Sequence, residues 1–503
     1  MSTLLFLLLA SQLPRAYAEG LHWEDWDRLQ VCSPLDFSIP PNEAEVVKIV
    51  KEAAAAGDSL KQVYSARSDQ ITTHQTLTAA PICPECGSLT PPCAPEKCLR
   101  VVGAGHSFTP IALTTGRMIS LDAMGAVLSV DAETHHVVVQ GGIRLRDLNH
   151  ELELRGLSIP NMGATCEQSV AGATATGTHG TGTALGSMST QIAGLRLVAA
   201  NGTVLEASAA VNPAVFAAAR VGLGALGVVT EVTLAAEPLF YLRLNNTVMP
   251  LDELLDTRLA AAMASCDRVQ WFWAPGDEEH ATLVTREVVA APASSGGGCW
   301  EGAFAGRHPG EDAALFGDDA ATPQSTSCTD VSYKALCGSR SHYKARVLYT
   351  EMEMFVPIDE VGAAIAEFRK AFAGGGDAPP GAGQLFCGVR YVAADEITLS
   401  PQHGRANAVI SFILRGPNTE ATGDPAVFRH YAQQLEAIAM GAHAGRPHWG
   451  KMHWSNETEL RPAYGDEAYD AFLAVRDALD PKRVFGNDFL RVHLDAMSTS
   501  KYG

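Results

Sequence analysis

A run of small residues between Ser169 and Gly182 constrains the fold of this 503-residue chain more than any other feature. It reads Ser-Val-Ala-Gly-Ala-Thr-Ala-Thr-Gly-Thr-His-Gly-Thr-Gly, with glycine, alanine or a hydroxyl side chain at almost every position. Such a run buries too little apolar surface to build a helix or sheet core, and strands expected on both sides argue against a flexible linker. It is typical of a backbone pressed against a large flat ligand, with hydroxyls and N–H groups reaching phosphates.

A glycine-rich turn comes directly after a predicted buried strand over residues 99–102. From Gly103 to Phe108 it reads Gly-Ala-Gly-His-Ser-Phe. A Rossmann dinucleotide fingerprint requires glycine at the sixth position, which is Phe108 here, so the Rossmann interpretation fails. What remains is a tight turn whose glycines let backbone N–H groups approach an anion, with His106 at its tip. An ordinary surface turn is the alternative.

The segment from Arg446 to Trp454 concentrates aromatic and basic side chains, and reads Arg-Pro-His-Trp-Gly-Lys-Met-His-Trp. We expect its tryptophans and histidines to form the walls of a site. Lys451 would supply a fixed positive charge near a reacting anion, which stabilises charge that develops in a transition state. A buried aromatic corner with a solvated lysine is the alternative.

Three motifs, at 103–108, 176–182 and 448–451, together resemble the aldonolactone oxidase and alditol oxidase family of vanillyl-alcohol-oxidase-type flavoproteins in their order and separation. The resemblance extends over about residues 36–237, 340–415 and 426–494. It implies an α+β fold, in which a two-subdomain PCMH-type FAD-binding domain is joined to an α/β cap (substrate) domain and a C-terminal return segment.

The composition and hydrophobic pattern along the chain, together with this resemblance, predict four segments. They are a signal peptide at 1–18, the FAD-binding domain at 19–237 with a cysteine-rich insertion at about 66–98, the cap at 238–440 with an insertion at about 291–340, and a C-terminal segment at 441–503 that packs back on the flavin site. Within them we expect a helix over 42–56 that Gly57 stops and a hairpin over 192–208 around Asn201-Gly202. Other expected strands are 117–121, 126–130, 136–140 and 227–234, and other expected helices are 144–155, 213–220 and 426–440.

The resemblance implies FAD as cofactor, carried covalently by the histidine of the first motif, His106, through the 8α-methyl of the flavin. Gly103, Ala104, Gly105 and Ser107 would hold the pyrophosphate, and Val228 would cover the adenine or ring region. The remaining residues implied to line the cofactor channel are Ser169, Gly172, Thr176, Gly177, Thr178 and His179.

The chemistry implied is oxidation of an alcohol, in which hydride leaves the carbinol carbon for flavin N5. Lys451 matches the family lysine that stabilises the developing oxyanion, and removing one such group typically costs about 3–4 kcal/mol. Arg390 matches the arginine that contacts substrate and ring, and His448 belongs to the same predicted catalytic set. Gly163 falls where the family places a small residue beside the oxygen-reactive carbon of the flavin, and glycine there leaves room for dioxygen.

One departure from the family concerns the substrate. Relatives carry a glutamate two residues before the arginine, and this position is Gly388 here; Glu353 matches a different family glutamate. We expect an oxidase of a sugar-1,4-lactone of the gulono-, galactono- or arabinono- type that forms hydrogen peroxide and an ascorbate-type product. Three alternatives stay open: an alditol or polyol oxidase, a dehydrogenase with a protein electron acceptor, and a metal or redox binding protein with a degenerate flavin domain.

The N-terminus predicts export. Residues 4–10 are apolar but too few to span a bilayer, which needs about 20, and Ala16-Tyr17-Ala18 offers a cleavage site. We expect the secretory pathway or the extracellular space, with association to a membrane through a short anchor as the alternative. Sequons at Asn201, Asn245 and Asn456 agree with a glycoprotein.

The 11 cysteines agree with an oxidising compartment. Cys83, Cys86, Cys93 and Cys98 would form two disulfides across a proline-rich loop, with a zinc site as the alternative. Cys299, Cys328 and Cys337 flank the second insertion and fit the same pattern. Cys166, beside the predicted flavin loop, is the cysteine expected to stay unpaired.

The charge of the chain restricts its partners. Lysine and arginine number 37 and aspartate and glutamate 56, so the formal charge is −19. Such an acidic surface repels phosphate backbones, which argues against nucleic acid as a partner. It also favours a small neutral sugar lactone or polyol, with dioxygen, over an anionic substrate.

Overall fold

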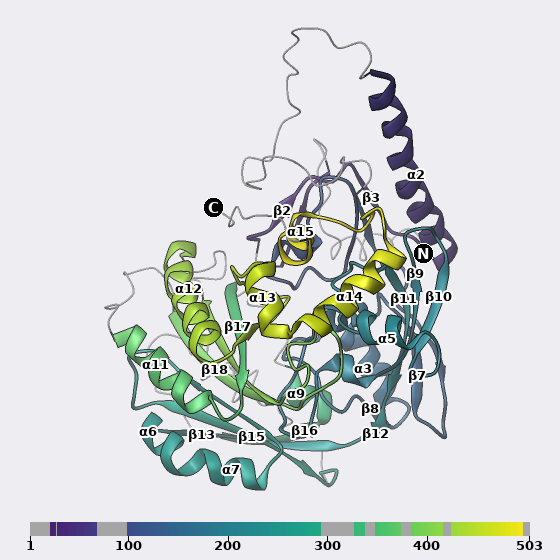
Figure 1. Cartoon of the computed structure of the whole chain (residues 1–503). Coiled ribbons are helices and arrows are strands. Elements are labelled where there is room, and N and C mark those ends of the chain that lie inside the picture. The colour runs from purple at the N-terminus through teal and green to yellow at the C-terminus, as the bar shows by residue number, and fades with distance from the viewer. Residues whose placement is uncertain are drawn as a thin grey trace.

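The computed structural model describes residues 21–26, 28–67, 98–292, 326–337, 348–373, 384–415 and 424–495. Figure 1 shows an N-terminal half beside a large sheet, with the C-terminal helices (yellow) between them. The predicted α+β fold is confirmed, because helices and sheets are mixed throughout. The described N-terminal half contains a three-stranded and a five-stranded sheet, besides two sheets of two short strands each. The predicted insertion at 66–98 lies almost wholly outside the described residues.

The first sheet of the N-terminal half is small and parallel, in the order β3-β5-β4. Its strands are β3 (Asp36–Ser38), β4 (Leu99–Val102) and β5 (Arg117–Ser120). Helix α2 (Glu43–Arg67) packs beside it through Val46, Val50 and Ala53. Asn42 accepts a hydrogen bond from the backbone of Glu45 and so starts the helix as predicted, but the helix continues through Gly57 because one glycine in a helix costs only about 1 kcal/mol.

The second sheet is antiparallel, in the order β10-β9-β11-β7-β6. Its strands are β6 (Val127–Val130), β7 (His136–Gln140), β9 (Ile192–Val198), β10 (Val204–Ser208) and β11 (Val228–Ala235). The predicted hairpin is confirmed as β9 and β10, and Gly202 in its turn has a φ of 77° that favours glycine. The helices that accompany this sheet are α3 (Leu145–Glu153), α4 (Val170–Ala175) and α5 (Pro213–Ala219).

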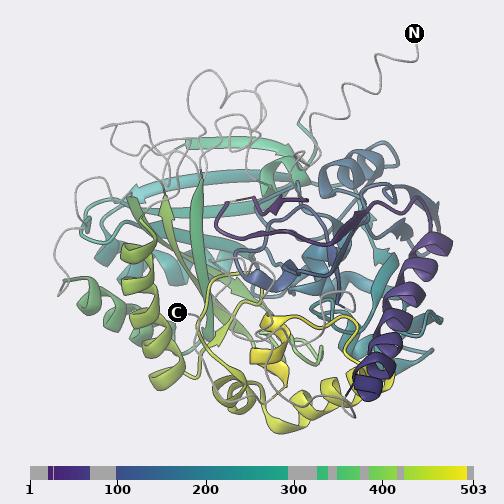
Figure 2. The same ribbon diagram turned by 90° about the horizontal axis from the view of Figure 1, so that it is seen from above.

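The cap is built on one eight-stranded sheet, in the order β16-β13-β15-β14-β18-β19-β17-β20. Its strands are β13 (Tyr241–Met249), β14 (Arg268–Trp273), β15 (Ala281–Val289), β16 (Thr326–Val331), β17 (Tyr349–Pro357), β18 (Gln384–Val392), β19 (Asn407–Arg415) and β20 (Arg446–Pro447). Its main helices are α7 (Leu259–Ser265), α11 (Val361–Ala373) and α12 (Pro425–Ala442). Figure 2, turned by 90°, shows α11 and α12 along one side of this sheet. Residues 326–337, within the predicted insertion at 291–340, form β16 and helix α9 (Ser332–Leu336).

Side chains alternate between the two faces of the cap sheet. On β17, Met352 and Met354 belong to the hydrophobic cluster that α11 and α12 cover. Their neighbours Glu351 and Glu353 therefore point to the other face, because successive strand residues point in opposite directions. Arg390 of β18 faces the same way, since its neighbours Val389 and Tyr391 belong to the helix-side cluster. This polar face is turned toward the N-terminal half.

The C-terminal segment joins the two halves. It contains α13 (Glu457–Tyr464), α14 (Asp466–Leu479) and α15 (Asp488–Leu494). The buried guanidinium of Arg100, on β4, donates to the backbone oxygens of Phe485 at 2.7 Å and Leu223 at 3.0 Å. Strand β4 and the glycine-rich turn that follows it are therefore fixed to the end of the chain.

A disulfide joins Cys166 to Cys337, which are 171 residues apart. The prediction that Cys166 stays unpaired is wrong, because the turn after α9 brings the cap cysteine to the flavin-side loop. Cys98 and Cys328 are disulfide-bonded too, which favours disulfides over zinc for the first cysteine cluster. Cys83, Cys86 and Cys93 lie outside the described residues.

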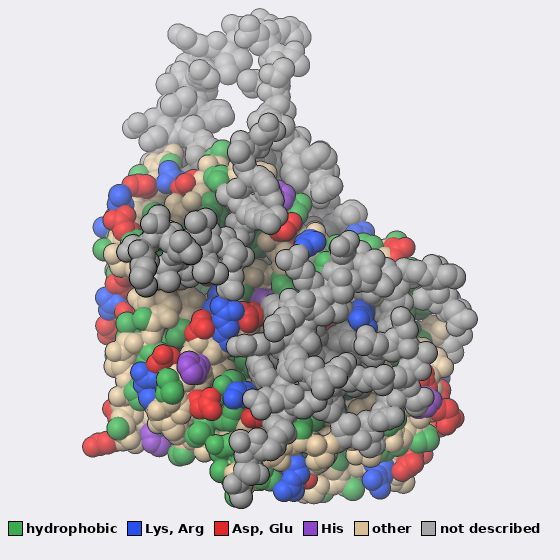
Figure 3. Space-filling view, turned by 180° about the vertical axis from the view of Figure 1, so that it is seen from behind, with side chains coloured by type: hydrophobic (Ala, Val, Ile, Leu, Met, Phe, Trp, Pro, Cys, Tyr) green, Lys and Arg blue, Asp and Glu red, His purple; other side chains and the backbone are tan. Residues whose placement is uncertain are grey.

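Among the described residues, no helix combines the length and apolar character needed to cross a bilayer. Figure 3 shows acidic and basic side chains interspersed over the described part of one face.

Candidate active site

A long cavity runs between the N-terminal half and the polar face of the cap sheet. Its lining begins at Arg100 and the residues that follow β4, passes the small-residue run, and reaches the cap at Tyr349, Glu351 and Arg390. The loop at 219–229 lines it in the N-terminal half, and His448, Gly450 and Lys451 of the C-terminal segment close it at the cap end. All three motifs singled out in the sequence thus meet in one cavity.

The glycines at the centre of this cavity make a close approach of the backbone possible. A Cβ added to Gly103 would overlap the Ser169 hydroxyl, and one added to Gly172 would lie 2.9 Å from the same oxygen. The first glycine turn and the small-residue run are therefore packed together with no room for side chains. The hydroxyls and backbone groups that remain fit a dinucleotide cofactor whose pyrophosphate lies against the backbone.

Most residues predicted to bind the cofactor line the cavity. They are Gly103, Ala104, Gly105, His106, Ser107, Ser169, Gly172, Thr176, Thr178 and His179. Gly177 is not in the lining; its φ of 77° makes the turn between Thr176 and Thr178. Val228 points away into a hydrophobic cluster with Leu121 and Val198, while its neighbours Gly227 and Val229 line the cavity.

His106 is half-buried beside the ring of Trp26, with centroids 5.5 Å apart and planes at 29°. Burial, and then the charges of Arg144 and Lys451, lower the pKa of His106 to about 3. Its imidazole is therefore neutral near pH 7 and keeps a lone pair, which a nucleophile needs.

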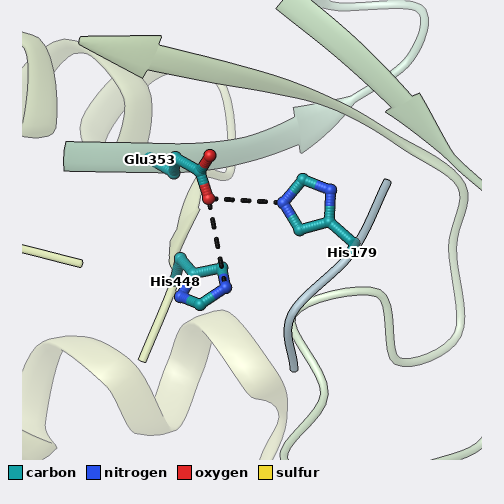
Figure 4. A group of neighbouring side chains, drawn as sticks. All are labelled: His179, Glu353 and His448. Atoms are coloured by element: carbon teal, nitrogen blue, oxygen red, sulfur yellow. Dashed lines mark hydrogen bonds and ion pairs between the residues drawn. The ribbon is translucent and has the colours of Figure 1, made fainter. Parts of the chain in front are cut away.

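Glu353 of β17 is the centre of a buried polar network (Figure 4). Its carboxylate lies 3.3 Å from His179 Nε2, accepts a hydrogen bond from Ser411 Oγ at 3.1 Å and lies 3.8 Å from an Arg390 nitrogen. Burial raises the pKa of Glu353, but the charges of Lys451 and His179 outweigh it and hold that pKa well below its usual value. Glu353 thus stays ionised and fixes residues from three separate segments.

The hydrogen bonds assign roles to the two histidines of Figure 4. His448 Nδ1 accepts from the backbone N–H of Gly450 at 2.9 Å, so its hydrogen is on Nε2, which faces Glu353 at 3.9 Å. His179 Nδ1 faces the Gly180 carbonyl at 2.9 Å. The two histidines and Glu353 are close enough for a metal ion. A metal ligand needs a lone pair on His448 Nε2, however, and the Gly450 contact leaves none in the neutral ring.

Lys451 forms an ion pair with Glu351, and both side chains line the cavity. The Lys451 ammonium also lies 4.8 Å from the centre of the Phe108 ring. Burial raises the pKa of Glu351 and the charge of Glu353 adds to this, although Lys451 opposes both. Lys451, Arg390, Gly163 and His448, the four predicted catalytic residues, all line the cavity.

Two glycines shape the walls. A Cβ at Gly163 would lie 2.8 Å from the Thr178 methyl group, so even alanine needs an adjustment there. A Cβ at Gly388 would lie 2.8 Å from the ring of Phe272, its partner on β14. A ring therefore occupies the space into which a carboxylate at position 388 would extend.

Sequence reasoning misplaced the tryptophans. Trp449 is fully buried in the core, where it stacks on Tyr464 and donates to the Leu399 carbonyl at 2.7 Å. The tryptophans that line the cavity are Trp23 and Trp26, from the N-terminal lead, and Glu351 was also missed. The two tryptophans three residues apart could have indicated that the N-terminal residues line a site. The alternation of side chains along β17 could have indicated that Glu351 faces the cavity.

Two family models match the chain. A model described as an FAD binding domain matches residues 93–208. A model described as D-arabinono-1,4-lactone oxidase matches residues 232–493, more than half of the chain. Together they cover both halves of the cavity.

Several curated proteins are similar over most of their length. L-gulono-1,4-lactone dehydrogenase of Mycobacterium tuberculosis is 32% identical over 93% of this chain and 98% of its own. L-gulonolactone oxidase of Bos taurus is 31% identical, with 78% of this chain and 89% of its own covered. Alditol oxidase of a Streptomyces species is 32% identical, with the same coverage.

A solved structure, the His121Ala mutant of cholesterol oxidase from Brevibacterium sterolicum, superimposes with a TM-score of 0.69. The superposition covers 96% of this chain and 99% of the other at 17% identity. At that identity the likeness shows the fold, which is the predicted PCMH-type FAD flavoprotein fold.

Proposed function

Because the chain belongs to the D-arabinono-1,4-lactone oxidase family, we propose that it oxidises a sugar 1,4-lactone with FAD and dioxygen, giving an ascorbate-type product and hydrogen peroxide. The observation that carries this proposal is the meeting of the glycine cradle at Gly103 and Gly172 with Lys451 and Arg390 in one cavity. The cradle fits a dinucleotide, and the two cations lie at the end that the cap covers.

When bound, FAD would accept the hydride from the carbinol carbon. The chain supplies the surroundings: Lys451 and Arg390 stabilise negative charge on the substrate oxygen, in a buried site where fixed charges act strongly. Glu353 holds Arg390 in place, and His448 adds a hydrogen-bond donor that stays neutral because burial lowers its pKa to about 3. The residues expected to hold the cofactor are those of the glycine cradle and the run from Thr176 to His179.

We further propose that His106 carries the flavin covalently. Its neutral imidazole in the cavity wall supports this, since attachment requires a nitrogen lone pair. Acid precipitation of the purified protein tests the linkage. A yellow pellet that becomes colourless in His106→Ala supports it, whereas a yellow supernatant from the unmodified protein means non-covalent FAD.

Dioxygen as electron acceptor rests on Gly163, which lines the cavity without a side chain and lies against the Thr178 methyl. A dehydrogenase with a protein acceptor is the second candidate, because the relative from Mycobacterium tuberculosis is named a dehydrogenase. Oxygen uptake during turnover separates the two: an oxidase consumes one dioxygen for each lactone oxidised, and a dehydrogenase requires an added acceptor.

The substrate we propose is a small neutral sugar lactone, with polyols as the alternative. The acidic balance of the chain supports a neutral substrate, because a formal charge of −19 repels anions. A panel of gulono-, galactono- and arabinono-1,4-lactones and of alditols, measured for peroxide formation, tests this. A higher kcat/KM for the lactones than for the alditols supports the proposal. A higher kcat/KM for the alditols would instead indicate a polyol oxidase.

We propose that the protein enters the secretory pathway through a signal peptide at 1–18, with membrane association as an alternative. Disulfides at Cys98, Cys166, Cys328 and Cys337 support an oxidising compartment. N-terminal sequencing of secreted protein that begins at Glu19 would support cleavage, and a retained Met1 would contradict it.

A further inference from the structure

The oxidation of an alcohol requires a group that takes the proton of the reacting hydroxyl, and the cavity contains few candidates. The titratable side chains at its cap end are Tyr349, Glu351, Glu353 and Lys451, with His179 and His448 beside them. Their hydrogen bonds decide which of them has an acceptor atom to offer.

The network around Glu353 excludes three of these groups. The Glu353 carboxylate is occupied by Ser411, His179 and Arg390. The charges of Lys451 and His179 hold its pKa low, which makes it a weak base. His448 has its lone pair on Nδ1, bound to the Gly450 N–H. His179 directs both ring nitrogens at oxygens, those of Gly180 and Glu353.

Glu351 is different from Glu353, although the two lie on one face of β17 two residues apart. Its side chain makes one hydrogen bond in the described structure, to Lys451 Nζ through Oε2. Oε1 is left as an acceptor on a side chain that lines the cavity. The charged groups that face it are Lys451 from the C-terminal segment, Glu353 from its own strand and Arg390 from β18.

We propose that Glu351 is a catalytic residue of this oxidation and accepts the proton of the reacting hydroxyl, while Lys451, held by the same carboxylate, faces the oxygen. The O–H bond of the substrate breaks and its proton forms a new O–H bond on Glu351. The C–H electron pair leaves with its hydrogen as hydride to the oxidised cofactor, and the C–O bond becomes a carbonyl. Glu351 thereafter releases the proton to water.

This inference rests on the proposed function, because it needs an alcohol-oxidising flavin site. Two features of the cavity support it. The ring of Phe272 fills the space beside Gly388, so no carboxylate reaches the substrate from that position. Burial and Glu353 also keep Glu351 more basic than an ordinary carboxylate, which suits a proton acceptor near neutral pH.

The test compares the protein with Glu351→Gln in anaerobic stopped-flow reduction of the bound flavin by a 1,4-lactone across pH. A general base contributes roughly 100- to 10,000-fold, so we expect the variant to lose that much in reduction rate and to lose the rise of the rate with pH. Glu287→Gln, at an exposed ion pair with Arg243, is the matched control and should behave like the unmodified protein. An unchanged rate and pH profile in Glu351→Gln would overturn the inference.

Two further variants keep the test decisive. Glu351→Asp retains the carboxylate, so it should keep the rise of the rate with pH at a lower maximum; loss of that rise would contradict the inference even if Glu351→Gln fails to fold. In Glu351→Gln/Lys451→Met, effects on one step should combine less than multiplicatively, and full multiplication would contradict a shared role.

A binding measurement separates this inference from the proposed function. A lactone that lacks the reacting hydroxyl should perturb the flavin spectrum with a similar Kd in the protein and in Glu351→Gln, because the proton acceptor acts on the missing group. A tenfold or larger loss of affinity would instead make Glu351 a binding residue. If no lactone or alditol reduces the flavin of the unmodified protein, the proposed function itself fails.

Discussion

The ring of Trp26 stacks on the imidazole of His106, and its backbone N–H donates to the Gly105 carbonyl at 2.8 Å. The N-terminal lead therefore holds the proposed flavin-linking histidine. We predict that Trp26→Ala lowers the fraction of acid-precipitable flavin several-fold, because the imidazole loses the wall that fixes its orientation. Absorption of the acid pellet, relative to protein, measures this fraction.

Trp26→Phe is the matched variant, since it keeps an aromatic ring at the same place. It should retain most of the covalent flavin. Equal flavin content in Trp26→Ala and the unmodified protein would show that the stack has no role in attachment.

Gly163 offers a prediction about oxygen. Gly163→Ala places a methyl group 2.8 Å from the Thr178 methyl in the cavity wall, and we expect it to slow reoxidation of the reduced flavin by air at least tenfold while slowing reduction by substrate less. Stopped-flow measurement of the two half-reactions checks this.

The double variant Gly163→Ala/Thr178→Ser separates obstruction from strain, because serine removes the methyl group that alanine would meet. If the added methyl blocks dioxygen, reoxidation stays slow in the double variant. Recovery of reoxidation there would mean that strain on Thr178, and not loss of space, caused the effect.

The disulfide between Cys166 and Cys337 ties a cavity loop to the cap across 171 residues. Closing a loop of that length restricts the unfolded chain strongly, so we predict that Cys166→Ala/Cys337→Ala lowers the free energy of unfolding by about 2–5 kcal/mol. Urea unfolding measures it. Cys387→Ala, a buried cysteine outside any disulfide, is the control for lost packing alone and should cost less.

Glu353→Gln tests the buried network. Removing one partner from a buried ion pair costs about 3–5 kcal/mol, whereas Glu287→Gln at the exposed pair with Arg243 should cost at most about 1 kcal/mol. The charge of Lys451, and the charge and hydrogen bond of His179, hold the pKa of Glu353 below the value of about 4.3 expected in the unfolded chain. The stabilisation is therefore complete above that pH and is lost as the pH falls through the lower folded pKa.

Urea unfolding of Glu353→Gln and the unmodified protein at several pH values checks this sign. The difference between their free energies of unfolding should be largest near neutral pH and should decrease below about pH 4. A difference in the free energy of unfolding that increases as the pH is lowered would contradict an ionised Glu353.

The cofactor half of the cavity was predictable because its signals are local. Large side chains would prevent the backbone from approaching a ligand closely. The glycines and hydroxyl side chains at 103–108 and 169–182 therefore indicate such an approach from the local sequence alone. The hairpin at 192–208 and the strand at 99–102 follow in the same way from turn chemistry and hydrophobic pattern.

The cap end was predictable only in part, because its contacts depend on the packing of distant segments. Cys166 reaches Cys337 only when α9 packs against the N-terminal half, and the spacing of cysteines in the sequence does not predict that contact. Trp449 points into the core because the Leu399 carbonyl satisfies its indole N–H there. Glu351 becomes notable only when β17 is aligned with the C-terminal segment that carries Lys451.

Anaerobic mixing of the purified protein with a sugar 1,4-lactone tests whether it is a lactone-oxidising flavoprotein. We predict that the protein is yellow as purified, that the lactone bleaches the visible flavin band, and that air restores the band with formation of hydrogen peroxide. A protein without flavin, or a flavin band that no lactone and no alditol bleaches, would contradict it.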